Sequence, residues 1–347
     1  FNNSPFVTGD GIGIIDISSF PEGVFLDGNN IGFTSGMSVL PFYNLGGQLL
    51  LDAVYVRDQN YAGNNEDINV FKGNSNKNAD NPQFWNIVEG SNPQKNDIID
   101  AMGHLRRDGR FLNDPLWAFI GVSTRSGDGS AYVDFELYRN ELEYDEINTQ
   151  ILNTGTQGGH TAWEFLDNGG DIDISQLGDV IISLVFEKGG VEINGHIYVW
   201  VKPSELPGGS ITAANTAFDS DPDNTVKFRF VMSGNQPVFE QGDQSDGYGY
   251  AEIELPSDNS ETVAFASING VDDKGTKSKA DDVPGDTPTG DFKTLSGSQA
   301  NAFTFHPENT FVEFALNLSG IGLDQTSVEG DGCDALFGGV IIKTRSS

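Results

Sequence analysis

Hydrophobic and polar residues alternate most clearly in the middle of the chain, over residues 116–137. Residues 116–122 are apolar, with aromatic and β-branched side chains, and residues 126–130 read Ser-Gly-Asp-Gly-Ser. Glycine and aspartate tolerate the positive φ angles of tight turns, so this segment predicts a turn. After it, Asp134 and Glu136 alternate with apolar neighbours, which is the period of a strand with one buried face. We therefore expect an antiparallel hairpin whose two carboxylates point outward.

Similar strand-like segments recur along the rest of the chain. They lie at residues 12–17, 37–43, 48–57, 179–186, 191–201, 225–232, 248–255, 262–268, 311–318 and 336–344. No segment shows a convincing apolar stripe at helical spacing, and residues 93–103 come nearest. Long loops rich in Gly, Asn, Asp and Ser separate the strands. This pattern predicts an all-β fold, namely an antiparallel β-sandwich of jelly-roll or lectin-like type with long loops.

The connection at residues 203–224 is the best candidate for an internal domain boundary, because it is long and rich in Ser, Gly and Asp. Residues 272–291 form a second polar stretch, which mixes Lys with Asp and contains two prolines, and it predicts an exposed loop. A length of 347 residues allows one large all-β domain or two ordinary ones.

The chain is strongly acidic, with 51 Asp and Glu residues against 19 Lys and Arg residues and a formal net charge of −32. Nucleic-acid phosphates and anionic membrane surfaces both require a positive face, so this charge argues against either partner. It fits a self-repelling exterior, a saline habitat or a set of cation sites. Solvation of the surface explains most of these carboxylates.

Cysteine use and hydropathy add two further limits. Cys333 is the single cysteine, so the chain can form neither an intrachain disulfide nor a cysteine metal cage, and we expect it to be inert and buried. No apolar run is long enough to span a membrane. The sequence begins at Phe1 rather than Met, which we interpret as a processed or partial chain and as favouring secretion.

The two carboxylates Asp134 and Glu136 are the candidates for glycoside hydrolysis. A glycosidase needs a pair of carboxylates flanking the scissile bond. Laminarinase-like sandwiches present Glu-x-Asp-x-x-Glu, and here the third acid is missing because the run reads Asp-Phe-Glu-Leu-Tyr-Arg. Outward-facing acids on an exposed strand are the commoner explanation. We therefore expect no enzymatic activity, and hydrolysis stays a third hypothesis.

Calcium is the cofactor that the acidic loops favour. Asp219, Asp221 and Asp223 alternate with other residues, as oxygen ligands in a cation-binding loop do. Asp171 and Asp173 form a second candidate loop. The glycine and glutamate of an EF-hand are absent at their required positions, and Asp-rich turns often serve only local hydrogen bonding.

The remaining candidates are histidines and tryptophans. None of the four histidines pairs with another at metal-binding spacing, so a structural role is expected for each. Trp163 follows a Gly-rich loop and is the candidate for stacking on a sugar ring, as in carbohydrate-binding modules.

Several segments, taken together and in order, resemble a module of very large secreted or surface-anchored bacterial proteins. The segments are Lys95-Asn96-Asp97-Ile98, His104 with Arg106, Leu116-Trp117 with Phe119, Arg125-Ser126, residues 129–135, Gly170-Asp171-Ile172, residues 197–201, residues 311–318, Cys333 with Phe337-Gly338, and residues 343–347. The resemblance covers residues 95–347 and implies a jelly-roll-like extracellular module without established activity. Residues 1–94 are less familiar, and we interpret them as an N-terminal β extension or interaction arm.

The expected function is therefore that of an extracellular structural or adhesive protein of the bacterial surface, possessing no enzymatic activity. Self-association into a filament or lattice, or binding to other surface proteins, could use strands at residues 12–17 and 340–344 that add to the sheet edge of a neighbour. The alternative is a calcium-dependent carbohydrate-binding module whose partners are glycans.

Overall fold

The computed structural model describes most of the chain from residue 43 onward. The described residues are 43–45, 48–58, 67–72, 77–111, 113–127, 131–145, 147–148, 150–186, 193–222, 226–240, 247–255, 264–269, 287–289, 293–296, 299–324 and 337–345. The predicted strand at residues 12–17 and the loop at residues 272–291 lie outside these ranges, as does Cys333.

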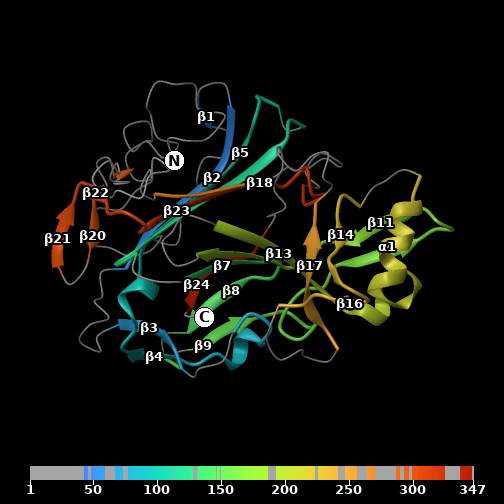
Figure 1. Cartoon of the computed structure of the whole chain (residues 1–347), viewed down its shortest axis with the longest axis horizontal. Coiled ribbons are helices and arrows are strands. Elements are labelled where there is room, and N and C mark those ends of the chain that lie inside the picture. The colour runs from blue at the N-terminus through green and yellow to red at the C-terminus, as the bar shows by residue number, and fades with distance from the viewer. Residues whose placement is uncertain are drawn as a thin grey trace.

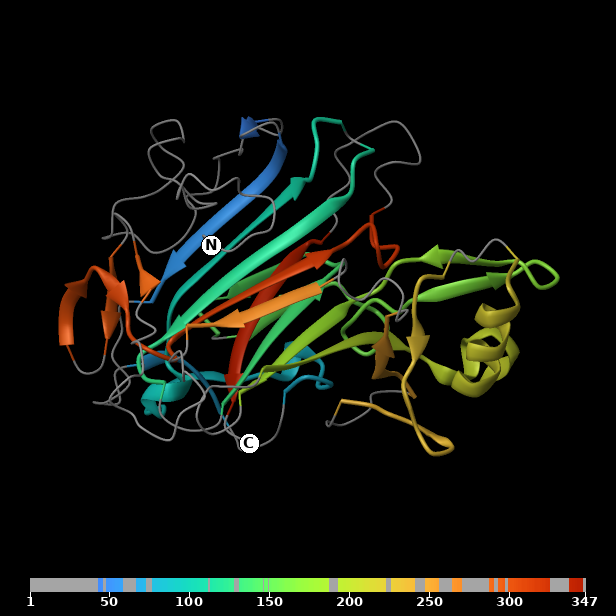
Figure 2. The same ribbon diagram turned by 45° about the horizontal axis from the view of Figure 1, so that its top comes forward.

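Two six-stranded antiparallel sheets form the body of the protein (Figures 1 and 2). The first has the order β1 (Tyr43–Leu45), β2 (Gln48–Arg57), β5 (Ile98–Arg107), β6 (Leu116–Thr124), β23 (Phe311–Asn317) and β18 (Ala264–Ile268). The second has the order β14 (Arg229–Phe230), β17 (Gly249–Glu254), β13 (Ile193–Val201), β12 (Val180–Phe186), β7 (Ala131–Tyr138) and β24 (Gly339–Arg345). The all-β antiparallel sandwich predicted from the sequence is confirmed.

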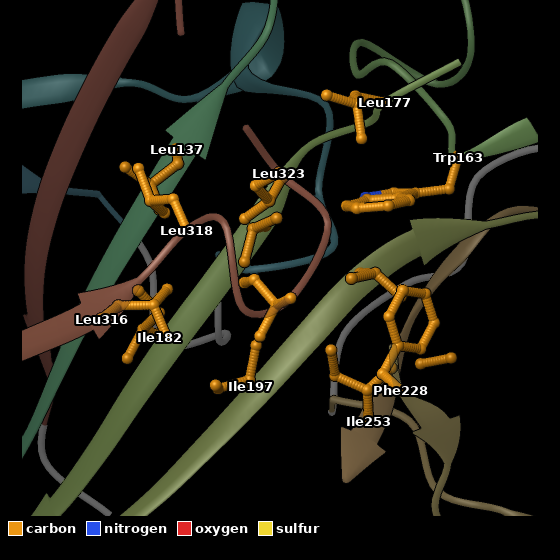
Figure 3. Packing of buried hydrophobic residues seen from close by; sticks show 14 of the residues in the cluster. Leu137, Trp163, Leu177, Ile182, Ile197, Phe228, Ile253, Leu316, Leu318 and Leu323 are labelled. Carbon is orange, nitrogen blue, oxygen red and sulfur yellow. The ribbon is translucent and has the colours of Figure 1, made fainter. Parts of the chain in front are cut away.

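The inner faces of the two sheets meet in one apolar core. Alternate residues of β6 and β23 pack against alternate residues of β7, β12, β13 and β17. Figure 3 shows Ile182 of β12 close to Leu316 of β23, and Ile197 of β13 close to Leu323, which follows β23. Burying each such side chain stabilises the fold by roughly 1.5–3 kcal/mol.

The expected hairpin between residues 116–122 and 132–137 is wrong in its pairing. Both segments are strands, but β6 pairs with β5 and β23 in the first sheet, whereas β7 pairs with β12 and β24 in the second. The chain therefore crosses between layers after β6. Alternation reveals a buried face, but it does not distinguish a hydrogen-bonded neighbour from a strand that faces it across the core.

An α-helix, α1 (Ile211–Ser220), lies within the stretch that we interpreted as a domain boundary. Ser210 caps its N-terminus, accepting a hydrogen bond from the amide of Ala213 at 3.2 Å. Its buried residues recur at helical spacing, but one of them is polar: Asn215 bonds the backbone N and O of Phe230, each at 2.9 Å. This polar residue weakens the apolar stripe, which is why the helix was missed. β13 precedes this stretch and β17 follows it, and the two strands pair, so the strands on both sides belong to the second sheet.

Short two-stranded pairs surround the sandwich. They are β3 (Asp67–Phe71) with β4 (Ile87–Gly90), β8 (Leu142–Asp145) with β9 (Gln150–Asn153), β10 (Glu164–Asp167) with β11 (Ile172–Gln176), β15 (Met232–Ser233) with β16 (Gln236–Pro237), β19 (Thr287–Pro288) with β22 (Phe305–His306), and β20 (Thr294–Ser296) with β21 (Gln299–Phe303). Single 3₁₀ turns occur at η3 (Pro82–Phe84), η4 (Gln94–Asn96), η5 (Pro203–Glu205) and η6 (Pro207–Gly209). Residues 93–103, whose pattern comes nearest to that of a helix, contain η4 and the first part of β5. β1 and β2 belong to the first sheet, so residues 43–57 add strands to the sandwich. The interpretation of residues 1–94 as a β extension or interaction arm stays a prediction.

His306 provides a test of the fold through pH. Burial lowers its pKa to about 4, and its ring stacks on Phe311 with the centroids 4.4 Å apart. The unfolded chain has an ordinary histidine pKa of about 6.5, so between these values it binds more protons than the folded protein. Stability is thus retained above about pH 6.5 and falls as the pH is lowered towards 4.

We expect the free energy of unfolding to lose about 2 kcal/mol from this histidine between about pH 7 and about pH 5. Denaturant titrations at both pH values give the change in the free energy of unfolding for the wild type and for His306→Gln. The contribution of His306 is the difference between these two changes. Buried His104, whose pKa is also lowered by burial and by Arg106, contributes equally to both proteins. Identical pH dependence in the two proteins would contradict the expectation.

Candidate functional site

The outer face of the second sheet carries polar side chains that are buried. In the antiparallel register, Lys343 of β24 lies opposite Asp134 of β7, which lies opposite Ser183 of β12. Asp134 and Glu136 are both 0% exposed. Their alternation with core residues was predicted correctly, but the expectation that they point into solvent is wrong.

Segments that are distant in the sequence cover this face. Trp85, which follows η3, is buried against Phe71 and beside Tyr138 and Ile151. Ala79 packs with Ile181, Tyr198, Trp200 and Tyr250. The cover therefore comes from residues 77–85, and the alternating pattern of β7 itself contains no sign of it.

Asp134 accepts hydrogen bonds on both carboxylate oxygens. Ser183 donates to Oδ1 at 2.5 Å, while Asn78 and Arg345 donate to Oδ2 at 3.1 and 2.8 Å. The Arg345 guanidinium also bonds Glu240 at 3.0 Å, so one cation joins two carboxylates. Charge-assisted bonds of this kind offset the cost of burying an ionised carboxylate.

Glu136 has a different environment. Lys343 Nζ contacts Oε2, and the hydroxyl of Tyr250 donates to Oε1 at 2.9 Å. The same Lys343 ammonium lies 4.6 Å from the ring centroid of Trp85, a cation–π distance. Burial and the nearby Glu136 carboxylate raise the pKa of Tyr250 well above 10, so its hydroxyl stays protonated.

A histidine–aspartate pair completes the arrangement. His160 Nδ1 lies 3.2 Å from Asp179 Oδ2 and 3.3 Å from the Tyr250 hydroxyl. The His160 ring lies between Trp200 and Tyr138, with centroid distances of 4.2 and 5.4 Å. Burial raises the pKa of Asp179 although His160 and two backbone amides bond to it. Within the described residues, His160 Nε2 has no hydrogen-bond partner.

We call this assembly the buried charge cluster. Its members are Asp134, Glu136, His160, Asp179, Glu240, Tyr250, Lys343 and Arg345. Four carboxylates face the cationic side chains of Lys343 and Arg345, and both of these residues belong to β24. The cluster therefore fixes β24 to β7, and in this conformation Asp134 and Glu136 are closed to a polysaccharide.

The described residues of the acidic loops form no common group of ligands. Asp219 forms an exposed ion pair with Arg229 at 3.0 Å, Asp221 is buried after α1, and Asp223 lies outside the described residues. In the second loop, Asn168 donates to Asp173 at 3.2 Å, and Asp171 precedes β11. Over the described ranges, no group of three His, Cys, Asp or Glu residues is arranged to hold a metal. Calcium binding stays a prediction.

Trp163 is buried rather than presented to solvent. Its ring packs edge-on against Phe228 at 5.5 Å and stacks on Phe165 at 6.5 Å. Its indole N–H donates to the backbone oxygen of Asp179 at 3.3 Å. A ring with covered faces offers no platform to a sugar, so Trp163 does not fit the predicted role in sugar stacking.

Sequence reasoning missed Lys343 and Arg345, which form ion pairs with the buried acids of the cluster. A signal was present: the pattern Lys-x-Arg near residue 343 has the same period of two as Asp-x-Glu at residue 134, with opposite charge. Complementary charges at matched period predict neighbouring strands. The contributions of His160, Glu240 and Tyr250 carry no such signal.

Comparison with known proteins found no matching family model, no similar curated protein and no similar solved structure. The resemblance to bacterial surface modules therefore stays a prediction. Within the described residues, no helix is long and apolar enough to cross a membrane.

Arg345 allows the energetic role of the cluster to be tested. Removing its guanidinium leaves Asp134 fully buried and Glu240 nearly so, each without its cation. We expect Arg345→Leu to lower the free energy of unfolding by about 3 kcal/mol, measured by denaturant titration. The same change at exposed Arg110 is the matched control and should cost under about 0.5 kcal/mol. Equal effects at both sites would contradict a structural role for the pair.

Proposed function

We propose that the chain is an extracellular structural or adhesive module of a bacterial surface, that it has no enzymatic activity, and that it associates with copies of itself through sheet edges. The observation that best supports this proposal is the structural role of the two acids that most resembled a catalytic pair. Asp134 and Glu136 are buried and ion-paired to β24, so they stabilise a sheet edge. The resemblance noted in the sequence agrees with such a role.

The edges of the two main sheets differ in length. β1, β18 and β14 have three, five and two residues, whereas β24 has seven. Within the described residues, β24 pairs with β7 alone. Short edge strands resist unwanted pairing, and a long edge rich in β-branched residues invites it. Val340, Ile341 and Ile342 give β24 this character, and Val340 is half exposed.

The net charge of −32 sets a condition on self-association. Copies of the chain repel one another unless salt or a divalent cation screens the surface. Association should therefore strengthen with ionic strength or with calcium at about millimolar concentration, the range of weak extracellular sites.

The assembly proposal is tested with Val340→Lys, which places a charge on the edge of β24. We expect wild-type protein to form large particles in calcium, seen by light scattering and negative-stain microscopy, and the variant to stay monomeric with its thermal stability retained. Phe111→Lys, at another exposed apolar residue, is the matched control and should assemble normally. A wild type that is monomeric under every condition would overturn the proposal.

Residues 12–17 lie outside the described residues and were predicted to provide a second strand for assembly. Deleting residues 1–19 should abolish particle formation while leaving the sandwich folded, as judged by circular dichroism. Unchanged assembly would remove this segment from the proposal and leave the edge of β24 as the contact.

A further inference from the structure

A lysine and a glutamate meet in the dry interior on neighbouring strands. Lys343 Nζ contacts Glu136 Oε2, and the two side chains are 4% and 0% exposed. In the register, Lys343 lies opposite Asp134, so Glu136 is its diagonal neighbour on β7. A long side chain spans a diagonal position easily.

We propose that Lys343 and Glu136 condense after folding into an intramolecular amide bond that joins β24 covalently to β7. The site is a self-modification site, and water is the only product. This proposal deepens the proposed structural function, because an edge strand fixed covalently resists being pulled away. It names a property of the single chain and does not depend on whether copies assemble.

The chemical step balances without a co-reactant. The ammonium of Lys343 first gives a proton to the Glu136 carboxylate, which leaves a neutral amine beside a neutral acid. Nζ then forms a bond to the carboxyl carbon Cδ, and the former carbonyl electron pair moves to Oε1. Nζ passes a second proton to the hydroxyl at Oε2, the Cδ–Oε2 bond breaks, and water leaves as the carbonyl reforms at Oε1.

Tyr250 is placed to assist this step. Its hydroxyl donates to Glu136 Oε1 at 2.9 Å, the atom on which negative charge develops. The raised pKa of Tyr250 keeps that donor protonated. A fixed donor aimed at a developing oxyanion lowers the barrier to acyl transfer. His160 Nδ1 lies 3.8 Å from the same oxygen.

Burial of both side chains protects the product of this reaction. The ring of Trp85 covers the lysine, and residues 77–85 cover the sheet face. Water is thereby kept from hydrolysing the amide once it forms.

Glu136 is the electrophile rather than Asp134, because their cations differ. Asp134 pairs with the guanidinium of Arg345, which stays protonated and cannot attack, and it also accepts bonds from Ser183 and Asn78. Glu136 instead contacts Lys343, whose amine can attack once it has given up a proton. The register therefore places one reactive pair beside one permanent ion pair.

The intact mass of the denatured full chain tests the proposal directly. We expect the wild type to weigh less than its sequence by the mass of one water molecule. Tandem mass spectrometry of a digest should find the peptide containing Lys343 joined to the peptide containing Glu136. A wild-type mass equal to the full sequence mass overturns the proposal and leaves only an ion pair, whatever the assembly experiments show.

Two matched variants assign the lost water. Lys343→Arg keeps the positive charge but removes the nucleophilic amine, so it should show the full sequence mass. Lys202→Arg alters a partly exposed lysine that pairs with Glu205 at 2.7 Å, and it should keep the deficit. A deficit that persists in Lys343→Arg would come from another dehydration, such as an aspartyl succinimide, and would overturn the proposal.

The role of Tyr250 is tested by rate. Chains made by cell-free synthesis are sampled over time, denatured and weighed. Tyr250→Phe should reach the cross-linked mass roughly a hundredfold more slowly than the wild type, with circular dichroism showing the same fold. An unchanged rate in the folded variant would show that Tyr250 only packs in the cluster and would overturn its assignment as a catalytic residue.

Discussion

Strand β7 is buried on both faces, and this constraint organises the rest of the structure. Its inner face contributes Val133, Phe135 and Leu137 to the core, while its outer face carries two carboxylates. Ionised carboxylates are tolerated away from water only when cations and hydrogen-bond donors surround them. The two residues that neutralise these acids, Lys343 and Arg345, both lie on β24. The buried acids of β7 are therefore neutralised only when β24 pairs with β7.

The same constraint draws distant parts of the chain together. Asn78 bonds both Asp134 and Glu240, and Arg345 bonds the same two acids. The segment between β3 and η3 is thus tied to the loop after β16 and to β24. Removing any residue of this network leaves a buried charge or polar group without a partner. The cover over the second sheet is therefore specified by hydrogen bonding as well as by apolar packing.

The hydrogen bonds and ion pairs of Asp134 and Glu136 bear on the function of the protein. An active site leaves its acids accessible and partly unsatisfied, whereas here Asp134 and Glu136 are enclosed and bonded on every carboxylate oxygen. An edge strand held by buried charge pairs agrees with the structural role that we propose. It also brings the amine of Lys343 and the carboxyl group of Glu136 together in the interior, and this contact is the basis of the proposed amide bond.

The sequence by itself determined the fold class and most strands, because alternation at a period of two follows from backbone geometry alone. It also determined which residues of β7 share a face. Tertiary structure decided the remainder. Alternation does not name a strand's partner, so β6 and β7 were placed in one hairpin although they lie in different sheets. It also does not reveal that residues 77–85 fold over Asp134 and Glu136, because burial by a distant segment leaves no periodic trace in the strand that it covers.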